Sequence, residues 1–233
     1  MPPAPRIDEL RAVAPARAAA ALARRRLEFY RPYVKQMRFH AEGAIHGERL
    51  LIAGNQLGKS IAGSAEWAMH LCGRYPSWWT GATFPSAVNM WASGVTNEST
   101  RDNPQRLLIG PPSQEDAWGT GMIPKDALIR CTKAMGIANS IDTVTVRHGG
   151  GGDVQAGVSV LGFKTYEKGR EKWQGPTLDG VWFDEEPPLA IYTEGLTRTN
   201  RGQRSQFAII TFTPLLGMSD VVRLFPVMGA ATA

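Results

Sequence analysis

The sequence predicts one α/β domain in which helices flank a mainly parallel β-sheet. Apolar runs at residues 50–52, 181–183 and 207–212 are typical of buried strands, and each is followed by small, acidic or hydroxyl side chains. A helical pattern follows the first run after a short loop. The chain has 233 residues, of which 43% are hydrophobic, so it is long enough to bury a substantial core.

The loop after the first strand has the pattern of a phosphate-binding loop. In such loops the backbone amides and the helix N-terminus face phosphate groups, a lysine contacts the β- and γ-phosphates, and a hydroxyl binds Mg²⁺. The pattern is a variant, because Ala53 stands where the first glycine is usual. The residues predicted to bind the nucleotide are Gly54, Asn55, Gln56, Leu57, Gly58, Lys59 and Ser60.

A second motif is the apolar strand at residues 180–183, which runs directly into three carboxylates. Hydrolysis of a nucleoside triphosphate needs two carboxylates with different roles. We predict that Asp184 holds Mg²⁺ together with Ser60, and that Glu185 polarises the attacking water, with Glu186 the weaker candidate. Acidic turns are common after strands, but this one follows a Gly-Lys-Ser loop in the order that the chemistry requires.

The strand at residues 207–212 leads to Thr213, and a period of two residues places Thr211 and Thr213 on one face. These hydroxyls either sense the γ-phosphate or simply end the strand. The charged loop at residues 163–175 precedes the acidic strand, and its Arg170 is predicted to stabilise charge during phosphoryl transfer. The alternative arginines are Arg198, Arg201 and Arg204.

Positive charge is concentrated near the N-terminus. Residues 1–49 hold ten basic and five acidic side chains, which accounts for the whole net charge of +5. Residues 16–26 have a helix-forming composition. In one interpretation this helix contacts DNA phosphates or an acidic partner, and in the other it is a solvated helix with a basic face. After Pro32, Gln36 and its aromatic neighbours form either an adenine pocket or a packed rim of the domain.

The other elements are predicted from local pattern. We expect a strand at residues 87–95, a helix beginning at Asn97, and a short helix at residues 125–135. Strands at residues 141–147 and 154–163 form a hairpin about a glycine run, with His148 exposed beside it. The glycine run is not a second phosphate loop, because neither Lys-Ser/Thr nor a helix follows it.

Two classes of protein are not expected. No apolar stretch approaches the length of about 18 residues that a membrane span needs. The N-terminus lacks the apolar region of a secretory signal, and Cys72 and Cys131 are too few for a metal cluster or a disulfide framework. We therefore expect a cytoplasmic protein with two buried free thiols.

The segments GNQLGKS, YEKGREKWQGPTLDGVWFDEEPP and ITFTP together resemble the ATPase domain of the large terminase subunit of tailed bacteriophages, the motor that packages DNA into procapsids. The resemblance extends over about residues 30–217. It implies a P-loop NTPase fold of the additional-strand, catalytic-glutamate type. The roles that it implies are phosphate binding at Gly58, Lys59 and Ser60, Mg²⁺ at Asp184, the catalytic carboxylate at Glu185, coupling at residues 211–214, adenine recognition at Gln36, and an arginine finger near Arg170.

The resemblance also implies an activity and partners. ATP hydrolysis with Mg²⁺ would move double-stranded DNA through a phage portal protein in the host cytoplasm, with the small terminase subunit as a further partner. The chain would act as a homo-oligomeric ring and be a monomer when alone. A helicase-like DNA motor and a nucleotide-binding assembly switch without turnover are the alternatives.

Two departures from the family pattern limit these expectations. Asn55 and Gln56 stand where some members have an arginine in the phosphate loop, so that arginine must come from elsewhere. Large terminases normally continue into a nuclease domain, whereas this sequence has few residues after Pro214, so DNA cleavage is not expected. We expect a basic segment at residues 1–45, an ATPase core at residues 46–217 and a tail at residues 218–233.

Overall fold

The computed structural model describes residues 19, 22, 24–149, 155–213 and 219–225. Most of the basic helix expected at residues 16–26 lies outside the described residues. So do residues 150–152 of the glycine run at residues 149–152, Pro214 of the segment for which a coupling role is predicted, and most of the expected tail.

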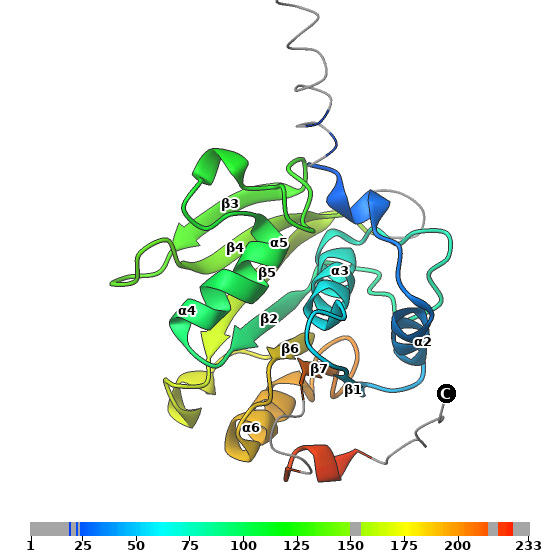
Figure 1. The fold of residues 1–233 in the computed structure, drawn as a ribbon, viewed down its shortest axis with the longest axis vertical. Coiled ribbons are helices and arrows are strands. Elements are labelled where there is room, and N and C mark those ends of the chain that lie inside the picture. The colour runs from blue at the N-terminus through cyan, green and yellow to red at the C-terminus, as the bar shows by residue number, and fades with distance from the viewer. Residues whose placement is uncertain (1–18, 20–21, 23, 150–154, 214–218, 226–233) are drawn as a thin grey trace, which may run out of the picture.

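A seven-stranded sheet forms the centre of the fold, in the order β1-β7-β6-β2-β5-β4-β3 (Figure 1). The first five strands in this order run parallel, and β4 and β3 extend the sheet antiparallel. β7 lies between β1 and β6, the strands of the two predicted motifs. The strands are β1 (Glu48–Ile52), β2 (Asn89–Gly94), β3 (Leu128–Lys133), β4 (Ile141–His148), β5 (Gly157–Thr165), β6 (Gly180–Asp184) and β7 (Ala208–Phe212).

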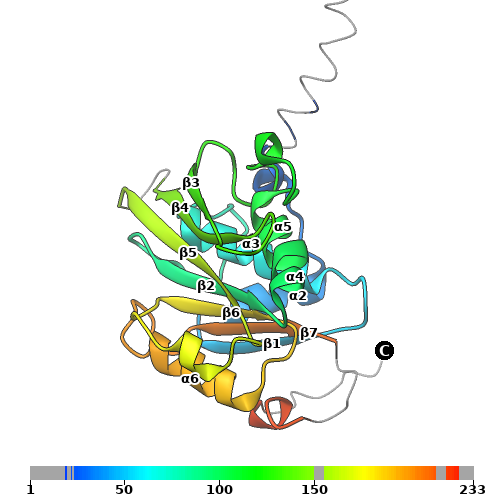
Figure 2. The same ribbon diagram turned by 90° about the vertical axis from the view of Figure 1, so that its left-hand side faces the viewer.

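Helices cover both faces of the sheet, as predicted. α6 lies on the face opposite to α3 (Figure 2). All five residues of β6 and of β7 are buried, which is typical of parallel strands covered on both sides. The helices are α2 (Val34–Glu42), α3 (Lys59–Cys72), α4 (Asn97–Thr100), α5 (Arg106–Ile109) and α6 (Leu189–Thr199), with the π-helix η2 (Arg101–Gln105) and the 3₁₀ turns η1 (Arg26–Phe29), η3 (Glu115–Ala117), η4 (Arg170–Trp173) and η5 (Val222–Leu224).

Successive side chains of the central strands enter two different cores. Trp182 packs with α3 on one face, and Phe183 packs with α6 and η4 on the other. This division follows from the two-residue period of a strand. The two cores hold β6 in place from both sides and thereby fix the position of Asp184 at its end.

The short helix predicted at residues 125–135 is wrong. Leu128–Lys133 forms β3, which pairs antiparallel with β4. Leu128 and Cys131 are half-buried against the core, while the residues between them are exposed. Pairing with the neighbouring hairpin strand at the sheet edge outweighs local helix propensity here.

The prediction of an exposed His148 is also wrong, because this side chain is buried. It shares its face of β4 with Val144 and Val146, which are core residues, so the alternation of the strand turns it inward. Its Nδ1 lies 3.1 Å from the carbonyl oxygen of Leu71 and 3.2 Å from Ser159 Oγ.

The two cysteines are free, with Cys72 buried and Cys131 half-buried. Within the part of the chain that the structure describes, no helix has both the length and the apolar character needed to cross a membrane.

Candidate active site

The phosphate loop and the acidic pair meet in one pocket, at the carboxyl ends of β1, β7 and β6. The pocket has a volume of about 410 Å³. Its lining residues are Asn55, Gln56, Gly58, Lys59, Ser60, Ile61, Asn103, Asp184, Glu185 and Thr213. The structure therefore brings together residues that are more than a hundred positions apart in the sequence.

The loop between β1 and α3 has a compact, partly left-handed backbone. Gln56 has a φ of 61° and Gly58 a φ of 76°. This left-handed conformation favours glycine at position 58, and a Cβ there would also lie 2.9 Å from the end of the Gln36 side chain. The Gly58 carbonyl accepts from the amide of Ala62 at 2.9 Å, and α3 begins at Lys59.

Lys59 lies inside the curve of the loop and is only 7% exposed. Its Nζ donates to the Gly54 carbonyl at 2.7 Å and to Thr213 Oγ1 at 2.9 Å. Thr213 Oγ1 in turn donates to Asn55 Oδ1 at 2.9 Å. Thr213 therefore links the end of β7 to both the lysine and the loop.

Asp184 is buried and accepts two hydroxyl hydrogen bonds on the same oxygen. Ser60 Oγ donates to Asp184 Oδ1 at 2.7 Å, and Thr211 Oγ1 donates to it at 2.8 Å. Burial raises the pKa of Asp184 to about 6. The two hydrogen bonds act in the opposite direction and lower this pKa, whereas the nearby charge of Glu185 raises it further. Trp182 Nε1 donates to Thr211 Oγ1 at 2.8 Å and so fixes this hydroxyl.

Glu185 has a left-handed backbone, with a φ of 71°. Its amide donates to the Thr211 carbonyl at 2.9 Å, and the Tyr166 hydroxyl donates to its carbonyl at 2.8 Å. These bonds hold a conformation that a residue with a side chain rarely adopts. Glu185 lines the pocket and Glu186 does not, so the geometry favours Glu185 of the two.

Ser60 and Asp184 provide oxygen donors that fit Mg²⁺. Hydroxyl and carboxylate oxygens are hard ligands, and Mg²⁺ usually takes only one or two protein ligands beside waters and phosphate oxygens. Among the described residues there is no cluster of three or more His, Cys, Asp or Glu side chains that could form an all-protein metal site. The donor set thus suits a metal that is shared with a phosphorylated ligand.

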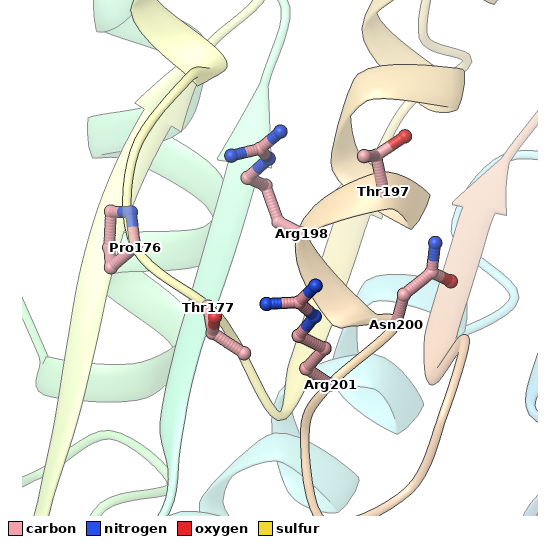
Figure 3. A pocket seen from close by; sticks show the side chains of 6 residues that line it. All are labelled: Pro176, Thr177, Thr197, Arg198, Asn200 and Arg201. Carbon is pink, nitrogen blue, oxygen red and sulfur yellow. The ribbon is translucent and has the colours of Figure 1, made fainter.

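None of the four candidate arginines lines this pocket. Arg170 is 62% exposed, and its Nε donates to Glu194 Oε2 at 2.9 Å. Arg198 and Arg201 line a different pocket of about 330 Å³, at the end of α6 and beside Pro176 and Thr177 (Figure 3). Arg204 donates to backbone carbonyls of residues 43 and 44.

Gln36 lies against the phosphate loop, and the hydrogen bonds of its side-chain amide are to protein backbone. Its Nε2 donates to the Gly58 carbonyl at 3.0 Å, and its Oε1 accepts from the Tyr33 amide at 2.9 Å. Gln36 is not among the residues that line the pocket.

Three residues at the site were not identified from the sequence, and one of them is Ile61, which lines the pocket from the first turn of α3. Asn103 lines the pocket from the π-helix η2, a rare form of helix that is often found at functional sites. A Pro104 inside a helical pattern was the one available signal. Tyr166, which supports Glu185, had no local signal because its contacts lie 18 and 19 positions away.

Comparison with known proteins gives consistent matches. A family model described as the terminase large subunit, T4likevirus-type, N-terminal, matches residues 50–225. The large terminase subunit of Salmonella phage P22 is 46% identical over 208 residues, which cover 84% of this chain and 41% of that protein. The large subunit of Enterobacteria phage LP7 is 33% identical over 140 residues, covering 60% of this chain and 28% of that protein. The chain thus spans less than half the length of either relative.

Solved structures of the ATPase domain of the Thermus phage P74-26 large terminase have a similar fold. The unmodified domain gives a TM-score of 0.51 at 19% identity, covering 80% of this chain and 66% of that chain. A mutant of the same domain gives 0.53 at 20% identity, covering 81% and 68%. At this level of identity the likeness shows the fold alone, which is α/β with a mainly parallel sheet.

Proposed function

The chain belongs to the family of N-terminal domains of T4likevirus-type terminase large subunits, and on this premise we propose that it hydrolyses ATP to drive the packaging of viral DNA. The observation that supports this most is the meeting of Lys59, Ser60, Asp184 and Glu185 in one pocket. Double-stranded DNA, a portal protein and a small terminase subunit are the partners that we propose from the family.

In the proposed mechanism the loop amides and Lys59 bind the β- and γ-phosphates of ATP. Lys59 would exchange its present contacts, the Gly54 carbonyl and Thr213 Oγ1, for phosphate oxygens. Ser60 and Asp184 would hold Mg²⁺, which when bound offsets negative charge on the β- and γ-phosphate oxygens. A triphosphate carries enough negative charge to favour this exchange.

Glu185 is proposed as the general base. It would accept a proton from a water molecule while the water oxygen forms a bond to the γ-phosphorus and the bond from that phosphorus to the bridging oxygen breaks. The products are ADP and inorganic phosphate. The bonds to Thr211 and Tyr166 keep the backbone of Glu185 in its strained conformation, at a position that lines the pocket.

Phosphate release by wild-type chain, with and without DNA, tests this proposal against the variant Glu185→Gln. The glutamine cannot take the proton, so turnover should fall about 100-fold or more while ATP still binds. Glu186→Gln is the matched control and should stay near wild type. Turnover by Glu185→Gln at the wild-type rate would contradict the proposal, and so would ATP binding without any turnover at high protein and DNA concentrations.

A further inference from the structure

We infer that the pocket at the end of α6 binds a phosphate group of the DNA backbone through Arg198 and Arg201. The inference rests on the proposed function, which supplies the DNA. It gives a role to two arginines that the sequence offers for phosphoryl transfer but that do not line the nucleotide pocket. This α6 pocket is lined by Pro176, Thr177, Thr197, Arg198, Asn200 and Arg201.

The α6 pocket and the nucleotide pocket lie near opposite ends of β6. Pro176 and Thr177 precede this strand, whereas the acidic pair of the nucleotide pocket follows it. Figure 3 shows Arg198 and Arg201 extending from the end of α6 toward the segment that carries Pro176 and Thr177. The two pockets share no lining residue, so a ligand in the α6 pocket can be bound together with a nucleotide.

The lining of the α6 pocket combines positive charge with hydrogen-bond donors. Two of the described residues that line it are arginines, and none is an acid. Arg201 is exposed, and within the described part of the chain its side chain forms no ion pair or hydrogen bond. The exposed Thr177 and Asn200 add a hydroxyl and an amide. A guanidinium beside neutral donors is an arrangement that binds phosphate oxygens.

Arg198 is held in the wall of the pocket and keeps a share of its charge. Its Nη2 pairs with Glu194 Oε1 at 3.0 Å, and its Nη1 donates to the Gly175 carbonyl at 3.1 Å. Glu194 also pairs with Arg170 at 2.9 Å, so one carboxylate serves two arginines and the cluster stays positive. Arg198 Nε is buried without a partner among the described residues, a cost that a shift of the side chain toward a phosphate would relieve.

The C-terminal end of α6 opposes an anion less than a free helix end would. The last carbonyl groups of a helix carry partial negative charge. In α6 the Arg198 carbonyl accepts from the Leu178 amide at 2.9 Å, and the Thr199 carbonyl accepts from the Gln206 amide at 3.2 Å. These carbonyls are therefore used inside the protein, and the arginines dominate the charge of the pocket.

The pocket suits a polymer backbone better than a nucleotide. Among its described lining residues there is no aromatic side chain on which a base could stack, and the apolar walls typical of small-molecule sites are missing. Five of the six lining residues are exposed, so a long ligand can reach them. Contacts to phosphate alone carry no sequence information. We therefore expect the α6 pocket to contribute to DNA binding without sequence preference.

Fluorescence anisotropy of labelled duplex DNA, in two unrelated sequences and over a range of salt concentrations, tests the inference with the full chain. Arg201→Gln removes the charge, Arg201→Lys keeps the charge without the fork, and Arg198→Gln tests the second arginine. Arg223→Gln, at an exposed arginine outside the pocket, is the control for loss of charge. Circular dichroism selects a temperature at which every variant is folded. Titration calorimetry with inorganic phosphate is the second arm.

Arg201→Gln and Arg198→Gln should weaken binding of both duplexes by the same factor, about three- to tenfold, and should reduce the salt slope of the affinity by about 1. Arg201→Lys should lie between wild type and Arg201→Gln. Equal DNA affinity of Arg201→Gln and Arg223→Gln would overturn the inference. Inorganic phosphate binding that these variants lose while DNA affinity is unchanged would overturn it in favour of a free phosphate. Failure of the wild type to bind DNA at any salt concentration would instead refute the proposed function, and the inference with it.

Discussion

At the scale of single residues, the site depends on two buried charged groups that do not pair with each other. Lys59 is 7% exposed and contacts neutral oxygens, whereas Asp184 is 2% exposed and accepts from two hydroxyls. A direct ion pair would neutralise both groups. Their separate neutral partners leave the lysine available to an anion and the carboxylate available to a cation.

Thr213 is the residue for which this arrangement gives the clearest prediction. Its hydroxyl accepts from Lys59 and donates to Asn55. Thr213→Val removes both bonds at similar volume. Lys59 leaves Thr213 when it binds phosphate, so the effect on affinity comes from the bond to Asn55, which holds the loop to the end of β7; its loss should weaken Mg·ATP binding about three- to tenfold. Thr213→Ser keeps the hydroxyl and is the control. Equal affinity of the valine and serine variants, measured by displacement of a fluorescent nucleotide, would contradict this account.

At the scale of secondary structure, the position of α3 on the sheet sets the position of the loop. Gly63 is the point of closest approach, because a Cβ there would lie 2.7 Å from the ring of Trp182 in β6. Both partners are buried in the core between α3 and the sheet. The small residue lets α3 approach the strand that ends in Asp184.

Gly63→Ala should therefore destabilise the fold by about 1–2 kcal/mol. Overpacking costs about 1–3 kcal/mol, and a contact of 2.7 Å with an aromatic ring places this substitution in the upper part of that range, about 2–3 kcal/mol. The gain in helix propensity offsets about 1 kcal/mol of this cost. Urea unfolding measures the difference. The loss of stability caused by Gly63→Ala should be smaller when Trp182 has already been changed to Phe. The phenylalanine lacks the ring atoms that the new methyl group would contact. A Gly63→Ala variant as stable as wild type would show that the helix can shift without cost.

The sequence is informative about elements whose signals are local. The loop at residues 54–60, the strand ending in Asp184 and the β4–β5 hairpin each follow from a run of adjacent residues, and the structure confirms the elements. β3 and the burial of His148 were mispredicted because both depend on contacts with other elements. β3 forms by pairing with β4 at the edge of the sheet, and His148 is buried against Leu71 of α3. Asn103 was missed for the same reason.

At the scale of the whole molecule, a buried polar network joins α2, β1 and α3 beneath the phosphate loop. Glu66 of α3 forms ion pairs with Arg49 of β1, and its Oε2 lies 2.6 Å from His40 Nδ1 of α2. The side chain of Glu66 is fully buried and that of Arg49 is 4% exposed. The three elements that surround the loop are therefore tied to one carboxylate.

Glu66→Gln should lower the free energy of unfolding by about 3–5 kcal/mol at pH 7, because it leaves the buried charge of Arg49 without its partner. The exposed Glu98→Gln is the control for loss of a carboxylate. Chemical unfolding measures both. A loss no larger than that of Glu98→Gln would mean that water or other groups replace the pair.

The same pair predicts a pH dependence. Burial alone would raise the pKa of Glu66, but the charge of Arg49 and hydrogen bonds from His40 and His70 outweigh it and hold the pKa well below its usual value of 4.5. The unfolded chain then binds this proton more tightly, so the contribution of Glu66 is complete above pH 4.5 and is lost as the pH falls through the folded pKa. The stability gap between wild type and Glu66→Gln should shrink on acidification below about pH 4.5. A gap that widens there would contradict this sign.

Assembly is the remaining question at this scale, since no described arginine lines the pocket. We propose that Arg170 acts in the site of a neighbouring subunit of a ring. If Arg170 leaves Glu194, that carboxylate still pairs with Arg198 at 3.0 Å.

Arg170→Ala alone should hydrolyse ATP slowly, and mixing it with Glu185→Gln should restore turnover at high concentration, because each variant supplies what the other lacks. The exposed Arg223→Ala should hydrolyse ATP like wild type without mixing. A mixture no faster than the sum of its components would count against a role in trans.

The most direct test of the whole account is a crystal structure of the chain with Mg²⁺ and a non-hydrolysable ATP analogue. We expect the γ-phosphate at Lys59, the metal between Ser60 and Asp184, and Glu185 facing the γ-phosphate. Phosphates bound elsewhere, for instance in the pocket of Arg198 and Arg201, with the Lys59 pocket left empty, would contradict it.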